Sequence, residues 1–495
     1  MAAVDGSGTP ATDAAIVAFL AGASATDNVG VTSLTNDAPA TFPLGDTVVT
    51  FTALDAQNNS GTAQATLTVT DLTGPAVDLL FPLGGVVGST TTLTVTADDT
   101  LNGVTSVTVA GVNSVPPVDL VQDPTDPTLW RNTAVDVATL GAPLTVTATD
   151  GVANTTAVPV PVRTGAVPAA VGGGDAFSGP EDVAPEAGGT LVVVDPGAFG
   201  VPLGALRVAP GTGDRTLIAA SGSGDFPGAV QVADDGTIWV ADGNQQGLLQ
   251  VDEAARLLNL VYGPTDPDPT TGLDPTNNPW DFLFPGDFAI ESAGSFLVLD
   301  ATECSAFVRV DPGAATAGDQ LFIDFLDPRL GGCVADSMAM SGTDIFYLDA
   351  SGQTLYLLDP ATDDTVVSGF DSNIPGVVGA PAGANFNDPI DLAVEPDGQI
   401  LVIDYDGFSA ATLLRVNPVT GDRTPLSGTG PSLFVPHSVV VDSRTGRIFV
   451  VVGAMDGSGG CLAGVWQVEP TTGDRALLSA SPASDFFSFC GGSAF

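Results

Sequence analysis

Three aspartates stand at equivalent places in a repeated pattern, and carboxylates arranged in this way could bind a cation. Six short apolar segments follow one another in the second part of the chain, and they open with Asp182, Ala229, Asp287, Ser337, Asp391 and Ser438. If these segments surround one axis, the three Asp could hold Ca²⁺ or another hard cation, because such ions prefer oxygen ligands. The alternative is structural: each Asp caps its own turn or bonds the backbone of a neighbouring repeat.

A second set of aspartates closes the next apolar segment of each repeat. These residues are Asp195, Asp242, Asp300, Asp349 and Asp404. We interpret them as mainly structural, each accepting backbone N–H bonds in the turn that follows. Asp404 differs, because Asp406 follows it in Asp-Tyr-Asp-Gly. This pair is a further candidate for a metal site.

His437 is the only histidine of the chain, and it precedes the equivalent position in the sixth repeat, where the first repeat carries Glu181. A general base there is conceivable, and the alternative is a histidine on a surface loop. A single histidine excludes a His-rich metal site.

No GxSxG, HExxH or phosphate-binding loop occurs, so hydrolase, zinc-protease and nucleotide-binding functions lack their residues.

The elements that would position these residues form a repeat of about 50 residues. Its clearest copy runs from Pro389 to Gly428: an apolar strand, a Gly turn, a second strand ending in Asp, a third strand, a turn and a fourth. The third strand leads into Pro-x-x-Gly-Asp-Arg in three copies, starting at Pro210, Pro418 and Pro470. Each copy is therefore predicted to be an antiparallel meander of four strands.

Six such meanders predict a six-bladed β-propeller from 174 to 495. The Pro, strand, Asp-Gly, strand, Asp order resembles NHL-repeat and gluconolactonase-like propellers, from about Gly172 onward. Gluconolactonase-like propellers use a metal held by acidic and Asn side chains. The resemblance implies that Glu181, Asp287 and Asp391 match part of that set, although no Asn occupies an equivalent position.

Cysteines and arginines also follow the repeat. Cys304 and Cys333 are 29 residues apart, as are Cys461 and Cys490, at points that lie on one face of a propeller. We predict disulfides Cys304–Cys333 and Cys461–Cys490, with the other pairings left open, and hence an oxidising location.

Two sets of arginines recur and are expected to pair with Asp inside blades: Arg207, Arg309 and Arg415, and Arg215, Arg423 and Arg475.

Two further units precede the propeller. Residues 1–71 contain Phe-Pro-Leu-Gly-Asp-Thr-Val-Val-Thr-Phe-Thr-Ala-Leu-Asp and resemble a hyalin-repeat (HYR) module, an immunoglobulin-like β-sandwich of extracellular proteins, without its opening strand. We expect upstream sequence, with a signal peptide. Residues 72–163 resemble bacterial immunoglobulin-like repeats, with Trp130 in the core, and 164–173 are a Pro/Gly/Ala linker. The predicted fold is all-β: two immunoglobulin-like sandwiches followed by the propeller.

The formal net charge is −46, and all 12 cationic side chains are arginine. Such a surface repels nucleic acid and anionic membranes, and it suits divalent cations or high salt. No apolar run is long enough for membrane insertion. We expect an extracellular or cell-surface binding protein that recognises a protein, a glycan or copies of itself, with Ca²⁺ as a candidate cofactor. The alternatives are a self-assembling filament or lattice subunit and a metal-dependent lactonase or lyase.

Overall fold

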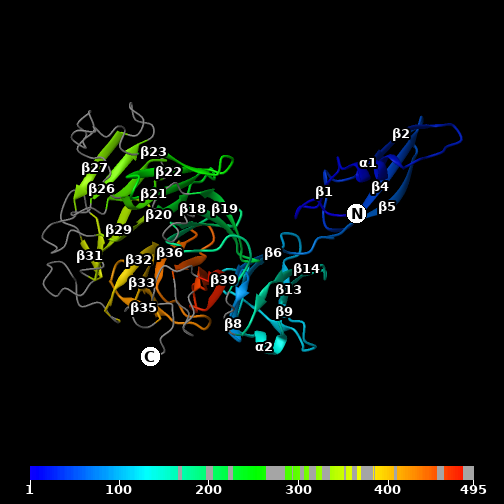
Figure 1. Ribbon diagram of the computed structural model, residues 1–495. Helices are drawn as coiled ribbons and strands as arrows, with labels where there is room; N and C mark the ends of the chain where they lie inside the picture. The colour runs from blue at the N-terminus through cyan, green and yellow to red at the C-terminus, as the bar shows by residue number, and fades with distance from the viewer. Residues whose placement is uncertain are drawn as a thin grey trace.

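The structure is a computed structural model, shown in Figure 1. It describes residues 1–165, 170–196, 204–220, 227–262, 285–291, 294–300, 306–311, 319–325, 335–349, 353–358, 365–368, 383, 385–405, 410–453 and 462–482. The four cysteines (304, 333, 461 and 490) and Asp406 lie outside these residues.

The propeller consists of six antiparallel meanders of four strands each, and a parallel bridge between Ala220 and Leu257 joins the first two into one sheet. Blade 1 contains β16 (Asp182–Pro185), β17 (Leu191–Asp195), β18 (Gly204–Ala209) and β19 (Asp214–Ala220). Blade 2 contains β20 (Pro227–Val232), β21 (Ile238–Asp242), β22 (Gly247–Asp252) and β23 (Leu257–Tyr262). Blade 3 contains β24 (Pro285–Ile290), β25 (Phe296–Asp300), β26 (Ala306–Asp311) and β27 (Asp319–Phe325).

The other three blades repeat this order. Blade 4 contains β28 (Ser337–Ser341), β29 (Asp344–Asp349), β30 (Thr354–Leu357) and β31 (Thr365–Ser368). Blade 5 contains β32 (Pro389–Val394), β33 (Ile400–Asp404), β34 (Thr412–Val416) and β35 (Arg423–Leu426). Blade 6 contains β36 (Pro436–Val441), β37 (Ile448–Val452), β38 (Leu462–Val468) and β39 (Arg475–Pro482).

The first strands of the blades surround one axis and close a ring. Each contacts the first strand of the next blade, and β36 of blade 6 contacts β16 of blade 1. Apart from Asp344 at the start of β29, the second strands are apolar up to their closing residue, which is Asp in five of them, because both their faces pack against neighbouring blades. β17, β25, β33 and β37 are buried at every position. A six-bladed β-propeller is the arrangement predicted from the repeats.

The segment before β16 seals the join between the last blade and the first. Val171 pairs with Ala480 of β39 through two backbone hydrogen bonds, of 2.8 and 3.0 Å. Gly174 forms a bridge with Arg215 of β19, and the Phe177 N–H donates to Ser481 Oγ at 2.7 Å. The end of the predicted linker is thus part of the propeller.

Ion pairs link the third strand of a blade to a glutamate, which corrects the prediction of Asp partners. Arg207 binds Glu186, Arg309 binds Glu291 and Arg415 binds Glu395. The Glu follows the first strand, so the pair must reach over the second strand, and neighbouring strands lie about 4.8 Å apart. The long side chains of Arg and Glu together span that distance.

The second arginine set (Arg215, Arg423 and Arg475) contacts backbone carbonyls and aromatic rings instead. Arg215, for example, donates to the Asp175 carbonyl and lies over Phe177, 5.1 Å from the ring centroid.

The second unit is a two-layer β structure. One sheet has the order β10-β9-β13-β14 and the other β11-β12-β8-β6. Their bounds are β6 (Ala76–Phe81), β8 (Thr90–Asp98), β9 (Val104–Ala110), β10 (Val118–Asp119), β11 (Val121–Gln122), β12 (Leu129–Asp136), β13 (Leu144–Asp150) and β14 (Thr155–Val160). The short helix α2 (Val137–Leu140) follows β12, and Trp130 is buried in the core as predicted.

The first unit differs from the all-β prediction by a helix. α1 (Ala14–Ala21) begins after Asp13, whose carboxylate accepts the Ala15 N–H at 2.8 Å. It packs Ile16 against the three-stranded sheet β2-β4-β5, which comprises β2 (Val31–Asn36), β4 (Gly45–Asp55) and β5 (Ser60–Val69). The short pair β1 (Thr9–Pro10) and β3 (Thr41–Phe42) completes the unit. Alanine and leucine favour helix in this run, and the absence of a helix from the predicted fold is thereby corrected.

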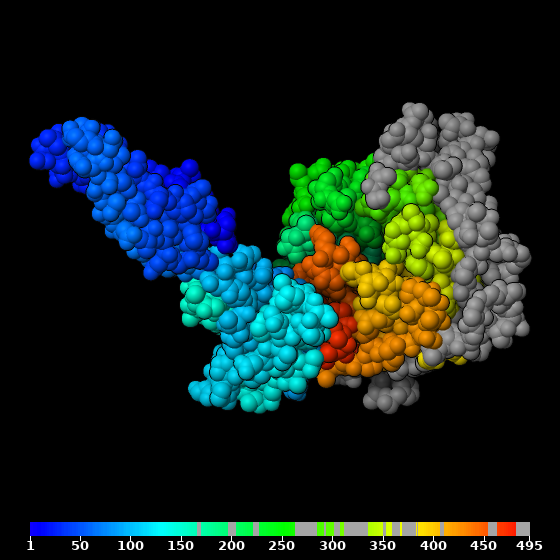
Figure 2. All heavy atoms as spheres, turned by 180° about the vertical axis from the view of Figure 1, so that it is seen from behind, coloured from blue at the N-terminus to red at the C-terminus, as the bar shows by residue number. Residues whose placement is uncertain are grey.

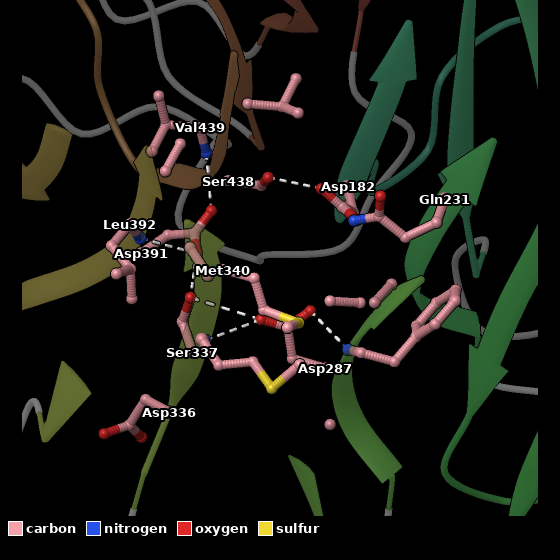
Figure 3. A pocket seen from close by; sticks show the side chains of 18 of the residues that line it. Asp182, Gln231, Asp287, Asp336, Ser337, Met340, Asp391, Leu392, Ser438 and Val439 are labelled. Atoms are coloured by element: carbon pink, nitrogen blue, oxygen red, sulfur yellow. Dashed lines mark hydrogen bonds between the residues drawn. The ribbon is translucent and has the colours of Figure 1, made fainter. Parts of the chain in front are cut away.

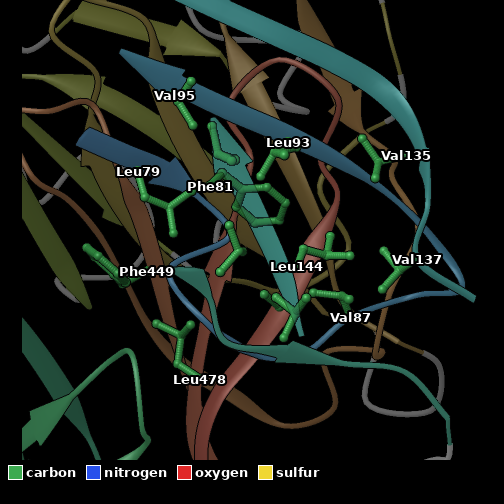
Figure 4. Packing of buried hydrophobic residues seen from close by; sticks show 14 of the residues in the cluster. Leu79, Phe81, Val87, Leu93, Val95, Val135, Val137, Leu144, Phe449 and Leu478 are labelled. Carbon is green, nitrogen blue, oxygen red and sulfur yellow. The ribbon is translucent and has the colours of Figure 1, made fainter. Parts of the chain in front are cut away.

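The second unit and the propeller share one hydrophobic core (Figure 4). Leu79, Phe81 and Leu93 of the unit belong to the same buried cluster as Phe449 and Leu478 of blade 6. The strand β7 (Gly85–Val86) pairs with β39, and β15 (Val162–Arg163) pairs with β7. In Figure 2 the second unit lies directly against blade 6, whereas the first unit extends away.

Polar bonds add to this junction. Asp474 accepts hydrogen bonds from the Thr92 N–H and hydroxyl, at 2.6 and 2.7 Å, and Gln467 bonds the backbone of Leu80 and Leu83. The second unit is therefore joined to the propeller by a shared hydrophobic core and by hydrogen bonds.

Candidate axial binding site

A cavity of about 400 Å³ opens on the propeller axis (Figure 3). Residues of the first strands line it, and five of its side chains are acidic: Glu181, Asp182, Asp287, Asp336 and Asp391. His437, Ser337, Ser438 and Gln231 are among its other polar residues. The structure thus brings the three predicted Asp of the first strands, here called the ring aspartates (Asp182, Asp287 and Asp391), to one cavity.

Each ring aspartate joins its own blade to the next. In Asp182, Oδ1 accepts the Val183 N–H at 2.7 Å and Oδ2 accepts the Val230 N–H of blade 2 at 2.8 Å. The same pair of bonds recurs from Asp287 to blade 4 and from Asp391 to blade 6, at 2.7 to 2.9 Å. The structural alternative from the sequence therefore holds for all three, which are fixed by the blades they connect.

Serines continue this network around the axis. Ser438 Oγ donates to Asp182 Oδ1 at 2.5 Å, and Ser337 Oγ donates to Asp391 Oδ1 and, at 3.4 Å, lies near Asp287 Oδ2. Ala229 occupies the equivalent place in blade 2 and has no hydroxyl. The small residues between the aspartates are thus part of the site, and the alternation of Asp and Ser was its signal in the sequence.

Burial makes these carboxyl groups weak acids. It raises the pKa of Asp182 to about 7 and that of Asp287 to about 8, and in both the charge of Asp391 is the second cause. Burial also raises the pKa of Asp391, to about 6, against the hydrogen bonds from Ser337 and the Val439 N–H. Like charges close together in an enclosed space disfavour simultaneous ionisation.

Glu181 and His437 meet at the cavity wall. His437 Nδ1 lies 2.6 Å from Glu181 Oε2, and each side chain is about 30% exposed or less. The two residues come from blades 1 and 6, so ring closure creates the pair. The sequence placed both next to equivalent positions, but not in contact.

Asp404, the other described candidate for a metal site, does not line the cavity. Its Oδ1 accepts the N–H groups of Asn387 and Asp388 at 2.7 and 3.0 Å, and its Oδ2 accepts the Asn387 side chain at 3.0 Å. Asp404 thereby fixes the loop that enters blade 5. Asp195 binds the entry loop of blade 1 in the same way, whereas Asp242 caps the turn that follows it, as the sequence indicated.

A second acidic group was not predicted. Carboxylate oxygens of Asp71, Asp99 and Asp150 all lie within 4.8 Å of one another at one end of the second unit. Among the described residues this is the only group of three potential metal ligands that close together, so the ring aspartates do not form one. Asp71 and Asp150 close two Thr-rich strands, and these repeated Thr-x-Thr-Asp endings were the available signal.

The comparisons with known proteins identify no relative by sequence. No family model matches the chain, and no curated protein is recognisably similar to it. In structure it is similar to a protein of unknown function from Bacteroides thetaiotaomicron, with 12% identity, a TM-score of 0.41, and coverage of 77% of this chain and 96% of the other. It is also similar to a gluconolactonase from Xanthomonas campestris, with 15% identity, a TM-score of 0.37, and coverage of 56% and 84%.

A structure of the nidogen/laminin complex is a third match, with 10% identity, a TM-score of 0.35, and coverage of 64% and 91%. TM-scores this low leave the class of the protein to its own strand pairing, which defines a mainly β protein with a six-bladed propeller and an acidic axial cavity. None of the helices in the described part of the chain has the length and apolar character to cross a bilayer.

Proposed function

We propose that this chain is an extracellular or cell-surface binding protein whose propeller is the ligand-binding head. The first two units, which we propose to be spacers, hold the head away from the surface, and we propose that the second of them is immunoglobulin-like. The continuous core between the second unit and blade 6 supports this arrangement, because it keeps the axial cavity in one orientation relative to the second unit.

The observation that carries the proposal is the charge of the axial cavity. Its described lining includes five carboxyl groups and one histidine but no arginine. A cationic group would relieve the repulsion among these carboxyl groups and displace their protons. We therefore propose that the cavity binds a cation, in the first place an ammonium group presented by a protein or glycan ligand. Ca²⁺ is the second candidate, and it would complete its coordination with water because the oxygens of the three ring aspartates are not all within 4.8 Å of one another.

Calorimetric titration with Ca²⁺ and with spermidine tests this function. Binding is expected to release protons, so the measured heat should depend on the ionisation enthalpy of the buffer. Asp287→Asn and Asp391→Asn should each weaken binding about tenfold or more, whereas Asp397→Asn, on an exposed turn, should not. Asp71, Asp99 and Asp150 could bind Ca²⁺ independently of the axial cavity. Binding to the cavity is therefore measured as the part of the heat that is lost in Asp287→Asn and Asp391→Asn. Equal binding by Asp287→Asn and the control would refute the proposal.

The second candidate is catalysis, favoured by the contact between His437 and Glu181. A histidine oriented by a carboxylate can act as a general base, as a lactonase or lyase would require. Turnover of a chromogenic lactone that His437→Asn abolishes would establish this candidate. Turnover that survives His437→Asn, or no turnover with or without added Ca²⁺, would rule it out.

Self-assembly is a third proposal, which rests on the first unit. Among the described residues, β2 and β5 each pair with only one strand, β4. Residues Met1–Ala3 bond the backbone only at the Thr68–Thr70 end of β5, so the edge of β2 and the rest of the edge of β5 are open. Open edges can accept a strand from another chain. Electron micrographs that show only single particles at every protein concentration would contradict it.

A further inference from the structure

A second cavity lies between the second unit and blades 5 and 6. Its volume is about 530 Å³, and it shares no lining residue with the axial cavity. Residues of β6, β8 and β12 form one wall, and the turns after β32 and β36 together with the end of β38 form the other. We call it the junction cavity.

Three arginines line the junction cavity, which is a large share of the 12 cationic side chains in this acidic chain. They are Arg131, Arg444 and Arg447. Arg447 is fixed in place, because one terminal nitrogen donates to Asp78 Oδ2 at 2.9 Å and to the Leu79 carbonyl at 2.7 Å. Arg131 Nε donates to Thr94 Oγ1 at 3.3 Å and lies 3.5 Å from Glu469 Oε1.

These guanidinium groups retain unused donors. Within the described structure, no group accepts a hydrogen bond from the terminal nitrogens of Arg131 or from one terminal nitrogen of Arg444. Arg447 Nε also has no partner among the described residues, but it is closed off from solvent and therefore is not a donor for a ligand. The terminal donors of Arg131 and Arg444 are open to solvent and can bind an anionic ligand in place of water, and carboxylates bind guanidinium groups in a two-pronged geometry.

The acidic side chains of the lining are already engaged. Glu395 binds Arg415, and Glu469 Oε2 accepts the N–H groups of Thr471 and Thr472 at 2.7 and 2.6 Å. Asp78 binds Arg447. Asp126 and Asp397, the remaining acids, accept hydrogen bonds within their own turns.

Apolar side chains make up much of the remaining wall: Leu80, Phe81, Leu129, Pro396 and Pro470. They would enclose the body of a small ligand, because apolar surface is favourably removed from water there. We infer that the junction cavity binds a small amphiphilic carboxylate, with its carboxylate on the arginines and its apolar body against these residues.

Benzoate is a suitable probe, and isothermal titration calorimetry on the full chain measures its binding. Saturable binding of one benzoate is expected, and benzamide, which has the same shape without the charge, should bind at least about tenfold more weakly. Arg444→Gln should reduce the benzoate affinity about tenfold or more without changing the melting temperature, because this side chain is 45% exposed.

Arg163→Gln, which removes an exposed arginine outside the cavity, is the matched control and should bind as the unchanged chain does. Arg131→Gln should weaken benzoate binding as Arg444→Gln does. A loss of affinity in both variants would show that the cavity as a whole binds benzoate, and not Arg444 alone. Absence of saturable benzoate binding, or equal affinity in Arg444→Gln and Arg163→Gln, would overturn the inference.

Discussion

His437 Nδ1 lies 2.6 Å from Glu181 Oε2, across the join between the last blade and the first. Behind the ring, a Cβ added to Gly453 would lie 2.4 Å from His437 Nε2, so the imidazole packs directly against this glycine. The absence of a side chain at Gly453 therefore allows the ring to reach Glu181. The histidine is held between the carboxylate of Glu181 and the backbone of Gly453.

Replacing Gly453 with alanine should displace His437 and break its contact with Glu181. The backbone of Gly453 is outside the left-handed region, so alanine itself is tolerated there. His437 is the only histidine, and its imidazole signals in ¹H–¹⁵N NMR spectra report the change without ambiguity. Gly179→Ala, where an added Cβ meets nothing within 4 Å, is the control. Unchanged imidazole shifts in Gly453→Ala would contradict this packing.

The ring aspartates should make the propeller less stable as the pH rises. Their pKa values, about 6 to 8 in the fold, exceed the ordinary value of 3.8, so the folded chain binds more protons than the unfolded one. This contribution is complete below about pH 4 and is lost as the pH rises through 6 to 8. Because water reaches these half-buried groups, we expect on the order of 1 kcal/mol from each.

Urea denaturation between pH 5 and 9 measures this dependence. Asp287→Asn should flatten the slope and raise stability at pH 9, whereas Asp397→Asn should keep the slope of the unchanged chain. Carboxylates with a lowered pKa, such as Glu291 beside Arg309, act in the opposite direction below about pH 4.5. A maximum of stability in weak acid follows, and stability that increases from pH 5 to 9 would exclude our assignment.

Asp474 should be essential for the junction between the second unit and the propeller. Its carboxylate accepts four hydrogen bonds, two from Thr92 and two from Thr429, and it is 5% exposed. Asp474→Ala leaves the buried Thr92 N–H without a partner and removes the bonds to the exposed Thr429, at a cost of about 1–3 kcal/mol in the free energy of unfolding. Limited proteolysis should then separate the second unit from the propeller at lower urea than in Asp235→Ala, which changes an exposed turn of blade 2 away from the junction, and identical cleavage of the two would contradict this role.

Gly172 should be necessary for closing the ring. Its φ is +78°, and an added Cβ would lie 1.8 Å from the Gly213 carbonyl oxygen. Gly172→Ala should therefore cost about 3 kcal/mol or more, from backbone strain and a clash with rigid backbone. Gly189→Ala, with a φ of +84° and open space, carries the strain alone and should cost about 1–2 kcal/mol. Equal melting temperatures for the two variants would show that this contact is not tight.

Local patterns predicted the blades, because strand and turn preferences act within a few residues. The segment from Pro389 to Gly428 folds as the four strands that its pattern indicated. The same patterns missed α1, where an alanine-rich apolar run is compatible with strand or helix. They also predicted Asp partners for Arg207 and its equivalents, since sequence spacing does not reveal that a side chain must cross the second strand to a glutamate.

By itself, the sequence determined a repeated four-strand unit, its number, and aspartates that alternate with small residues at the first strands. Only the tertiary structure decided what these residues contact. Closure of the ring brings Glu181 to His437 and Asp182 to Ser438, each 256 residues apart. It also joins the core of the second unit to blade 6. Local periodicity sets the strands, whereas contacts between distant segments depend on how the blades twist and close, which no short stretch of sequence specifies.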